Sequence, residues 1–97
     1  MSRFEISRNH SLGADTLHEI VQKVGDELVQ KHGGSTRWEG DELHYKQPMG
    51  IHGILTWDER SLHIDVKLGV MAGMFRSVIE DEVNHRLDKL LATYRKP

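Results

Sequence analysis

Two hydrophobic periods divide the chain into strands and helices. Near the N-terminus, Phe4 and Ile6 alternate with polar residues, which predicts a short strand. The next apolar side chains recur at spacings of three and four residues, which predicts a helix of about five turns. Its apolar stripe consists of Leu17, Ile20, Val21, Val24 and Leu28. Ser11 is the expected cap of this helix, and Gly33-Gly34 is its expected end.

From Thr36 onward the period changes to two, and short turns divide this segment into several strands. The turns are predicted at Gly40-Asp41, at residues 48–50 and at residues 58–61. Strands joined by such short turns pair antiparallel, with one face buried and the other wet. A second helix is predicted from about Met74 to Tyr94. Its apolar stripe consists of Phe75, Ile79, Val83, Leu87, Leu90, Leu91 and Tyr94.

The tight turns also predict how the middle strands align. Across one turn we place Gln47 opposite Ile51, and this alignment makes the inner face almost entirely apolar. Across the next turn we place Trp57 opposite Leu62. One row of the outer face then consists of Lys46, His52 and Lys67. We expect a lowered pKa for His52, because the two neighbouring lysines disfavour its protonated form.

The element order β-α-β-β-β-β-α defines the expected architecture. Two amphipathic helices and one half-apolar sheet can all bury their apolar surfaces when both helices cover the apolar face of the sheet. We therefore predict an α+β two-layer fold with a curved antiparallel sheet of about five strands, covered on one face by two helices. The chain has 97 residues, which predicts a single domain over residues 1–97.

Composition narrows the function classes. The chain has 13 basic and 15 acidic residues, a balance that argues against a dedicated nucleic-acid binder. It has no cysteine, which excludes disulfides and thiolate metal sites. No segment approaches the ~20 apolar residues that span a bilayer, and the N-terminus lacks the apolar run of a signal peptide. These features lead us to expect a soluble, cytoplasmic protein without a transmembrane segment.

The polar residues do not assemble into a reactive pattern. There are seven histidines, of which His44, His52 and His63 share the outer sheet face but lie in different rows. Zinc requires three or four convergent ligands, so we predict no metal site. The sequence also has no cysteine nucleophile, phosphate-cradling glycine loop or serine elbow. We therefore expect a protein that is not an enzyme, with no catalytic residues and no cofactor.

The segment "KLGVMAGMFRSVIEDEV", residues 67–83, combines apolar side chains with two glycines where a polar loop is usual. Its candidate apolar contact residues are Val70, Met71, Met74 and Phe75. Lys67 and Arg76 flank them as candidate polar contacts. These apolar side chains either form a docking surface or close the end of the core. Phe75 shares the stripe of Ile79, which favours inward packing for this residue. A homodimer through a self-complementary patch is a third alternative.

With these motifs in place, the chain resembles the polyhydroxyalkanoic acid system protein family. The resemblance rests on "HSLG" (10–13), "RWEGDELHY" (37–45), "GIHGIL" (50–55), "LHIDVKLG" (62–69) and "MFRSVIEDEVNHRLDKLL" (74–91). None of these is a catalytic signature. The resemblance implies a bacterial cytoplasmic protein linked to polyester storage granules and acting at their surface.

Two functions follow as hypotheses from the resemblance and the apolar segment. The first is a non-enzymatic accessory protein of polyhydroxyalkanoate storage that contacts the granule, or a granule-bound partner, through an apolar surface. The alternative is a small binding module for a hydroxyacyl or fatty-acyl ligand between the sheet and the C-terminal helix. Exposed Met71 and Met74 would favour the first hypothesis. An enclosed apolar pocket beneath Gly53, a glycine inside a strand, would favour the second.

Overall fold

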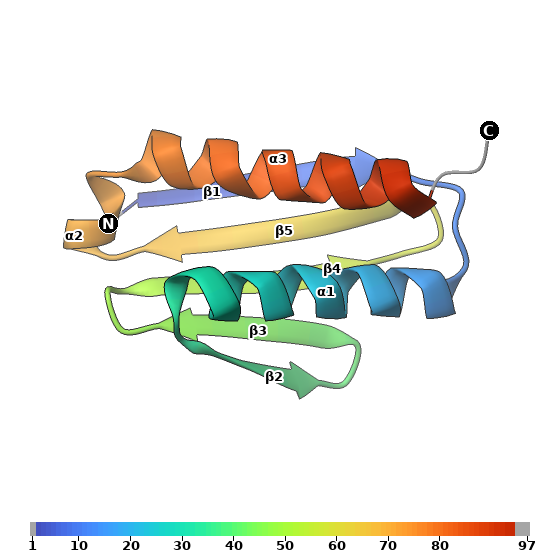
Figure 1. Ribbon diagram of the computed structural model, residues 1–97, viewed down its shortest axis with the longest axis horizontal. Coiled ribbons are helices and arrows are strands. Elements are labelled where there is room, and N and C mark those ends of the chain that lie inside the picture. Colours follow the sequence, from blue (N-terminus) through green and yellow to red (C-terminus); the bar gives the residue numbers. More distant parts are fainter. Residues whose placement is uncertain (1, 95–97) are drawn as a thin grey trace.

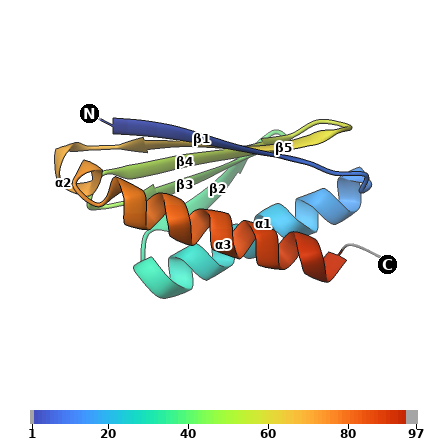
Figure 2. The ribbon, with the colours of Figure 1, turned by 90° about the horizontal axis from the view of Figure 1, so that it is seen from above.

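An antiparallel sheet forms one layer of the protein, and two long helices form the other (Figures 1 and 2). The computed structural model describes residues 2–94. Its elements are β1 (Ser2–Asn9), α1 (Ala14–His32), β2 (Ser35–Glu39), β3 (Glu42–Gln47), β4 (Ile51–Trp57), β5 (Ser61–Leu68), α2 (Val70–Gly73) and α3 (Arg76–Tyr94). Figure 2 shows α1 and α3 on the same side of the sheet, which confirms the predicted α+β two-layer architecture.

The sheet has five strands in the order β1-β5-β4-β3-β2, so the N-terminal strand lies at an edge. The predicted register is confirmed, because Gln47 pairs with Ile51 and Trp57 pairs with Leu62. The register was predictable because a one-residue slip would move every apolar side chain of a strand to the wet face.

The core lies between the sheet and the two helices. The predicted stripe of α1 is buried throughout, from Leu17 to Leu28, and α3 buries Val83, Leu87 and Leu91. The inner face of the sheet meets these helices with Phe4, Ile6, Leu43, Tyr45, Leu55, Leu62, Ile64, Val66 and Leu68. Full burial stabilises each large aliphatic side chain by about 1.5–3 kcal/mol relative to exposure. The hydrophobic pattern of the sequence therefore identifies most of this core.

The first helix begins later than predicted. Its N-cap is Gly13 rather than Ser11, and no side chain caps the helix. Residues before it are held instead by His10, whose backbone N–H donates to the carbonyl of Arg60 and whose Nδ1 accepts from the N–H of Leu12. These bonds carry the chain from β1 past the end of the sheet before the helix can begin. The predicted end is confirmed, since Gly33 follows the helix with φ of 75°.

The C-terminal helix also begins differently from the prediction. A separate short helix, α2, occupies residues 70–73, and α3 begins at Arg76 rather than at Met74. Val70 is the first residue of α2 and does not continue β5, which ends at Leu68. The chain turns at Gly69, whose N–H donates to the carbonyl of Gly50 at 2.8 Å. The backbones of these two glycines pack closely, because a Cβ at Gly69 would lie 3.5 Å from the Gly50 carbonyl oxygen.

Candidate functional site

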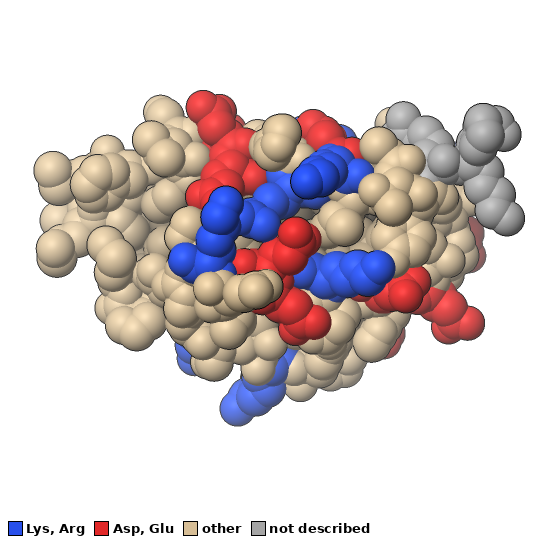
Figure 3. Space-filling model, viewed as in Figure 1, with Lys and Arg blue, Asp and Glu red and all other residues tan. Residues whose placement is uncertain are grey.

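Exposed apolar side chains gather at one end of the molecule, which we call the apolar end. It consists of Met49, Val70, Met71, Met74, Phe75 and Val78, and these are all the large apolar residues that are exposed within residues 2–94. Three segments supply them: the β3–β4 turn, the α2 region and the first turns of α3. The Gly69–Gly50 hydrogen bond joins the first two segments. Figure 3 shows this end, on its left side, without charged residues on the face in view.

All four predicted apolar contact residues lie in the apolar end. Val70 and Met74 are each 79% exposed, and Met71 is 68% exposed. Phe75 is 54% exposed, so the expectation that it packs inward is wrong. Its backbone N–H bonds to the Ala72 carbonyl at 3.0 Å, which assigns it to the turn before α3 rather than to the inward stripe.

Ala72 closes the core at this end. Closing the core was the alternative role that the sequence left open for the methionines. It is 1% exposed and is the buried residue of α2. The larger residues near it in sequence, Met71 and Met74, face outward.

Sequence reasoning missed Met49 and Val78. Met49 lies in a turn more than twenty residues before the others, and only the pairing of β4 with β5 brings it to the same end. The signal for Val78 was present, since it falls outside the inward stripe of α3.

The two predicted flanking cations lie on different surfaces. Lys67 is exposed on the outer face of the sheet, opposite His52 on β4 and Arg3 on β1. Arg76 lies at the start of α3 and forms an exposed ion pair with Glu80, at 3.8 Å. Both residues border the apolar end, one from the sheet and one from the helix.

A cavity of about 70 Å³ lies between the sheet and the helices. Its apolar lining comes from α1, α3 and the inner face of the sheet and includes Val24, Leu28, Ile51, Leu55, Ile64, Val66, Ile79 and Val83. Gly53 also lines it. A Cβ at Gly53 would lie 3.9 Å from the Cβ of Tyr45 and 4.0 Å from Cγ2 of Val66, which are ordinary contacts. The absent side chain of Gly53 therefore contributes to the space, and the apolar pocket beneath Gly53 is present.

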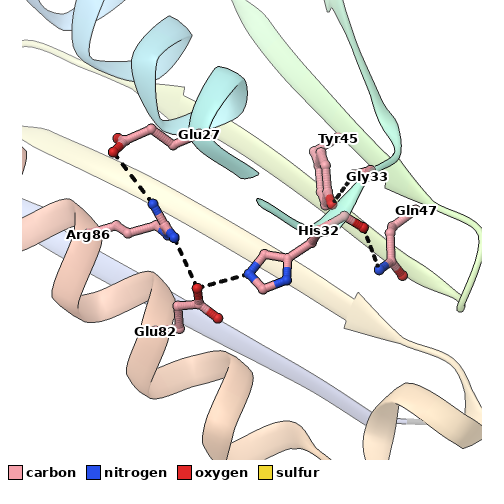
Figure 4. Close-up of polar contacts among 7 residues, drawn as sticks. All are labelled: Glu27, His32, Gly33, Tyr45, Gln47, Glu82 and Arg86. Carbon is pink, nitrogen blue, oxygen red and sulfur yellow. Dashed lines mark hydrogen bonds and ion pairs between the residues drawn. The ribbon is translucent and has the colours of Figure 1, made fainter. Parts of the chain in front are cut away.

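Polar side chains line one part of the cavity, which we call its rim, and Figure 4 shows their contacts. Its polar lining residues are His32, Gln47 and Glu82. Nε2 of His32 lies 2.8 Å from Oε1 of Glu82, and Nη2 of Arg86 donates to the same oxygen at 3.1 Å. Burial alone would raise the pKa of Glu82, but the hydrogen bonds from His32 and Arg86 outweigh it and lower that pKa. The rim thus holds a carboxylate that stays ionised at neutral pH.

Two further contacts fix this rim to the sheet. Nε2 of Gln47 donates to the carbonyl of His32 at 3.2 Å. The hydroxyl of Tyr45 donates to the carbonyl of Gly33 at 2.7 Å, and burial raises the pKa of this phenol. The end of α1 is therefore tied to β3 and to α3 at the same place.

The outer-face histidines form a pair rather than a metal centre. Nδ1 of His44 lies 3.2 Å from Nε2 of His52, and the other ring nitrogen of His44 lies 3.2 Å from Glu39. Residues 2–94 contain no group of three side chains placed to hold a metal ion. The pKa of His52 is lowered, as predicted, but burial is the leading cause and positive charge from His44 and Lys46 adds to it.

Comparisons with known proteins agree with the resemblance seen in the sequence. Residues 4–91 match the family model described as that of polyhydroxyalkanoic acid system proteins. This match runs from the first strand to the last turns of α3. A search of curated proteins found no match to the chain. Among the helices within residues 2–94, none is long and apolar enough to cross a membrane. The chain belongs to the polyhydroxyalkanoic acid system protein family.

Proposed function

We propose that this protein is a non-enzymatic accessory component of polyhydroxyalkanoate storage in the bacterial cytoplasm, and that it associates with the granule surface through its apolar end. The observation that carries the proposal is the gathering of Met49, Val70, Met71, Met74, Phe75 and Val78 at one end of the molecule. Contiguous exposed apolar surface on a small protein commonly marks a site of interaction.

The chemistry of the apolar end suits a polyester surface. Polyester presents aliphatic chains in no fixed arrangement, and methionine side chains adapt to irregular apolar partners. Met49, Met71 and Met74 supply three such side chains. Arg76 and Lys67 border them and can remain hydrated or meet anionic groups while the apolar side chains are buried.

Co-sedimentation with isolated granules tests this proposal. We expect the wild-type protein to sediment with granules and the Met71→Ser/Met74→Ser variant to lose most of this binding, because burial of apolar surface drives it. A matched control, Arg60→Ser/Lys89→Ser, also shortens two exposed side chains but leaves the apolar end intact, and we expect it to bind as the wild type does. Circular dichroism establishes that all three proteins are folded.

Granules stripped of their surface proteins separate the two kinds of partner. Binding to stripped granules is expected if the polyester itself is contacted. Binding only to unstripped granules would replace the polyester with a granule-bound protein partner. Equal sedimentation of the wild type and the methionine variant would reject the apolar end as the contact surface.

The cavity beneath Gly53 supports a second candidate function, the binding of a hydroxyacyl or fatty-acyl ligand between the sheet and α3. This function and the first are compatible, because the cavity lies inside the two-layer core and the apolar end lies on its surface. Saturable binding of an acyl ester by the isolated protein, without granules, would establish the second function independently of the first.

A further inference from the structure

The size of the cavity limits what can enter it. A cavity of about 150 Å³ lined by aliphatic and aromatic side chains is large enough to bind benzene, a six-carbon molecule. The present cavity has about 70 Å³. By proportion it accommodates about three carbon atoms, so a short alkyl group fits while the chain of a long fatty acid does not.

The lining determines which part of a ligand enters. Ten of the thirteen lining residues are apolar or glycine apart from the hydroxyl of Tyr45, and that hydroxyl already donates to Gly33. Apolar cavities of this kind stay dry and favour hydrocarbon over water. The alkyl end of a ligand therefore lies inward against Gly53, and any polar group lies at the rim formed by His32, Gln47 and Glu82.

The charge at the rim selects against acids. Glu82 is ionised, and its negative charge disfavours a second carboxylate nearby. Arg86 does not reverse this preference, because it also pairs with Glu27, with Nη1 3.5 Å from Oε1. Nε2 of His32 is already engaged by Glu82 and is not available to a ligand acid. An uncharged ester or thioester avoids the repulsion that a free acid meets here.

Glu82 also offers a specific contact to a hydroxyl group. His32 and Arg86 both reach its Oε1 atom. Within the part of the chain that the structure describes, no hydrogen bond reaches Oε2, and Figure 4 shows this oxygen turned away from both partners. A carboxylate oxygen only accepts hydrogen bonds, so the complementary ligand group is a donor, such as an alcohol.

We infer that the cavity binds a short-chain hydroxyacyl ester or thioester, with an alkyl end of about three carbons against Gly53, its hydroxyl at Glu82 and its uncharged acyl group at the rim. This inference rests on the second candidate function above. It narrows the ligand to hydroxylated, short and uncharged molecules, and it excludes long fatty acids.

The probe for this site is methyl 3-hydroxyhexanoate, titrated into the isotopically labelled full-length protein and followed by NMR. We expect saturable shifts in the methyl signals of Val66, Ile79 and Val83, which line the cavity. Three related compounds each change one property: methyl hexanoate lacks the hydroxyl, 3-hydroxyhexanoate is charged, and methyl 3-hydroxydodecanoate is longer. We expect each to bind about tenfold more weakly or worse. Methyl hexanoate loses one hydrogen bond to a charged group, the free acid meets the charge of Glu82, and the longer chain exceeds the cavity.

Two glycine substitutions locate the site. Gly53→Ala places a methyl group in the cavity without a clash and is expected to weaken binding by about tenfold or more. Gly13→Ala is the matched control, because a Cβ at Gly13 meets nothing within 4 Å. We expect it to bind as the wild type does. The Glu82→Gln variant, which removes the charge, should narrow the difference between the ester and the free acid.

Several results would overturn the inference. Absence of saturable shifts with every probe would reject the site, and equal binding by the Gly53→Ala and Gly13→Ala variants would place the ligand elsewhere. Tighter binding of the free acid than of the ester would reject the role given to Glu82. The Met71→Ser/Met74→Ser variant should bind the ester as the wild type does, so its failure on granules and a failure of this site are separable.

Discussion

At the residue scale, two glycines face the interior and have opposite surroundings. A Cβ at Gly25 on α1 would lie 2.7 Å from Cδ2 of Leu43 and 3.1 Å from Cγ2 of Thr36. A Cβ at Gly53 on β4 would make only ordinary contacts. Gly25 is therefore required for α1 to approach β3 closely, whereas Gly53 leaves space unfilled.

This difference predicts effects of opposite sign on stability. Glycine inside a strand costs roughly 0.5–1 kcal/mol relative to alanine, so Gly53→Ala should raise the free energy of unfolding by about that amount. Gly25→Ala gains about 1 kcal/mol of helix propensity but overpacks a buried leucine at a cost of about 1–3 kcal/mol. We expect a net loss on the order of 1 kcal/mol.

Urea denaturation measures both variants against the wild type. If Gly53→Ala unfolds at a lower urea concentration than the wild type, the space beneath Gly53 is too small for a methyl group. The stabilising substitution is also the one expected to block ligand, and a site that keeps a destabilising residue is a recognised signature of function.

The same scale shows why sequence reasoning succeeded with some residues and not with others. Gly53 was identified because an interior strand glycine removes a side chain wherever the strand lies. Met49 was missed because its neighbours in space are distant in sequence. Phe75 was misplaced because its spacing from Ile79 suits the inward stripe, and only the break in the helix before Arg76 turns it outward.

At the element scale, an ion-pair network joins the end of α1 to α3. His32 and Glu27 belong to α1, whereas Glu82 and Arg86 belong to α3 (Figure 4). The Arg86 side chain is only 12% exposed, so it depends on its carboxylate partners for compensation. The network therefore fixes how the two helices sit beside each other at the rim of the cavity.

Replacement of Glu82 by Gln should destabilise the protein in a pH-dependent manner. The pKa of Glu82 is lower in the folded state than its usual 4.5, so ionised Glu82 contributes stability above that pH. This contribution is lost as the pH falls through the folded-state pKa. We expect Glu82→Gln to cost about 1 kcal/mol near neutral pH and to lose less stability than the wild type on acidification.

Urea denaturation near neutral pH and again at about pH 3.5 tests this expectation, because the lower pH lies below the unfolded-state pKa of Glu82. A constant difference between wild type and variant at both values would mean that the carboxylate acts through packing rather than charge.

The strands were the elements best predicted from sequence. Their alternation and tight turns specify both pairing and register, since only one register buries every apolar side chain. The helix ends were less predictable. A hydrophobic stripe runs through Phe75 without interruption, and the backbone contact between Gly69 and Gly50, which marks the turn from β5 into α2, is a tertiary one.

At the scale of the whole molecule, the protein is elongated and its two ends differ. It measures 40 Å along its longest axis and 25 Å and 22 Å across it. The apolar end lies at one end of this axis, and the β4–β5 turn lies at the other (Figure 1). Arg60 belongs to this turn, because β4 ends at Trp57 and β5 begins at Ser61. Docking through the apolar end therefore directs the β4–β5 turn away from the granule.

The absence of cysteine makes this orientation directly measurable. Single-cysteine variants Met71→Cys and Arg60→Cys can each carry one polarity-sensitive fluorophore at a unique site. On granules, we expect the emission of the label at residue 71 to shift to shorter wavelength, because it enters an apolar environment. The label at residue 60 should keep the emission wavelength that it has in water. Equal shifts at both sites would contradict end-on docking.

Adjacent residues of α3 face two different environments. Val78 is exposed in the apolar end, while Ile79 lines the cavity. A single turn of helix thus has one residue on each of the two proposed contact sites, so both ligands would contact the same turn. Reciprocity then requires that, if an occupied cavity strengthens attachment to the granule, attachment must strengthen retention of the small molecule by the same factor.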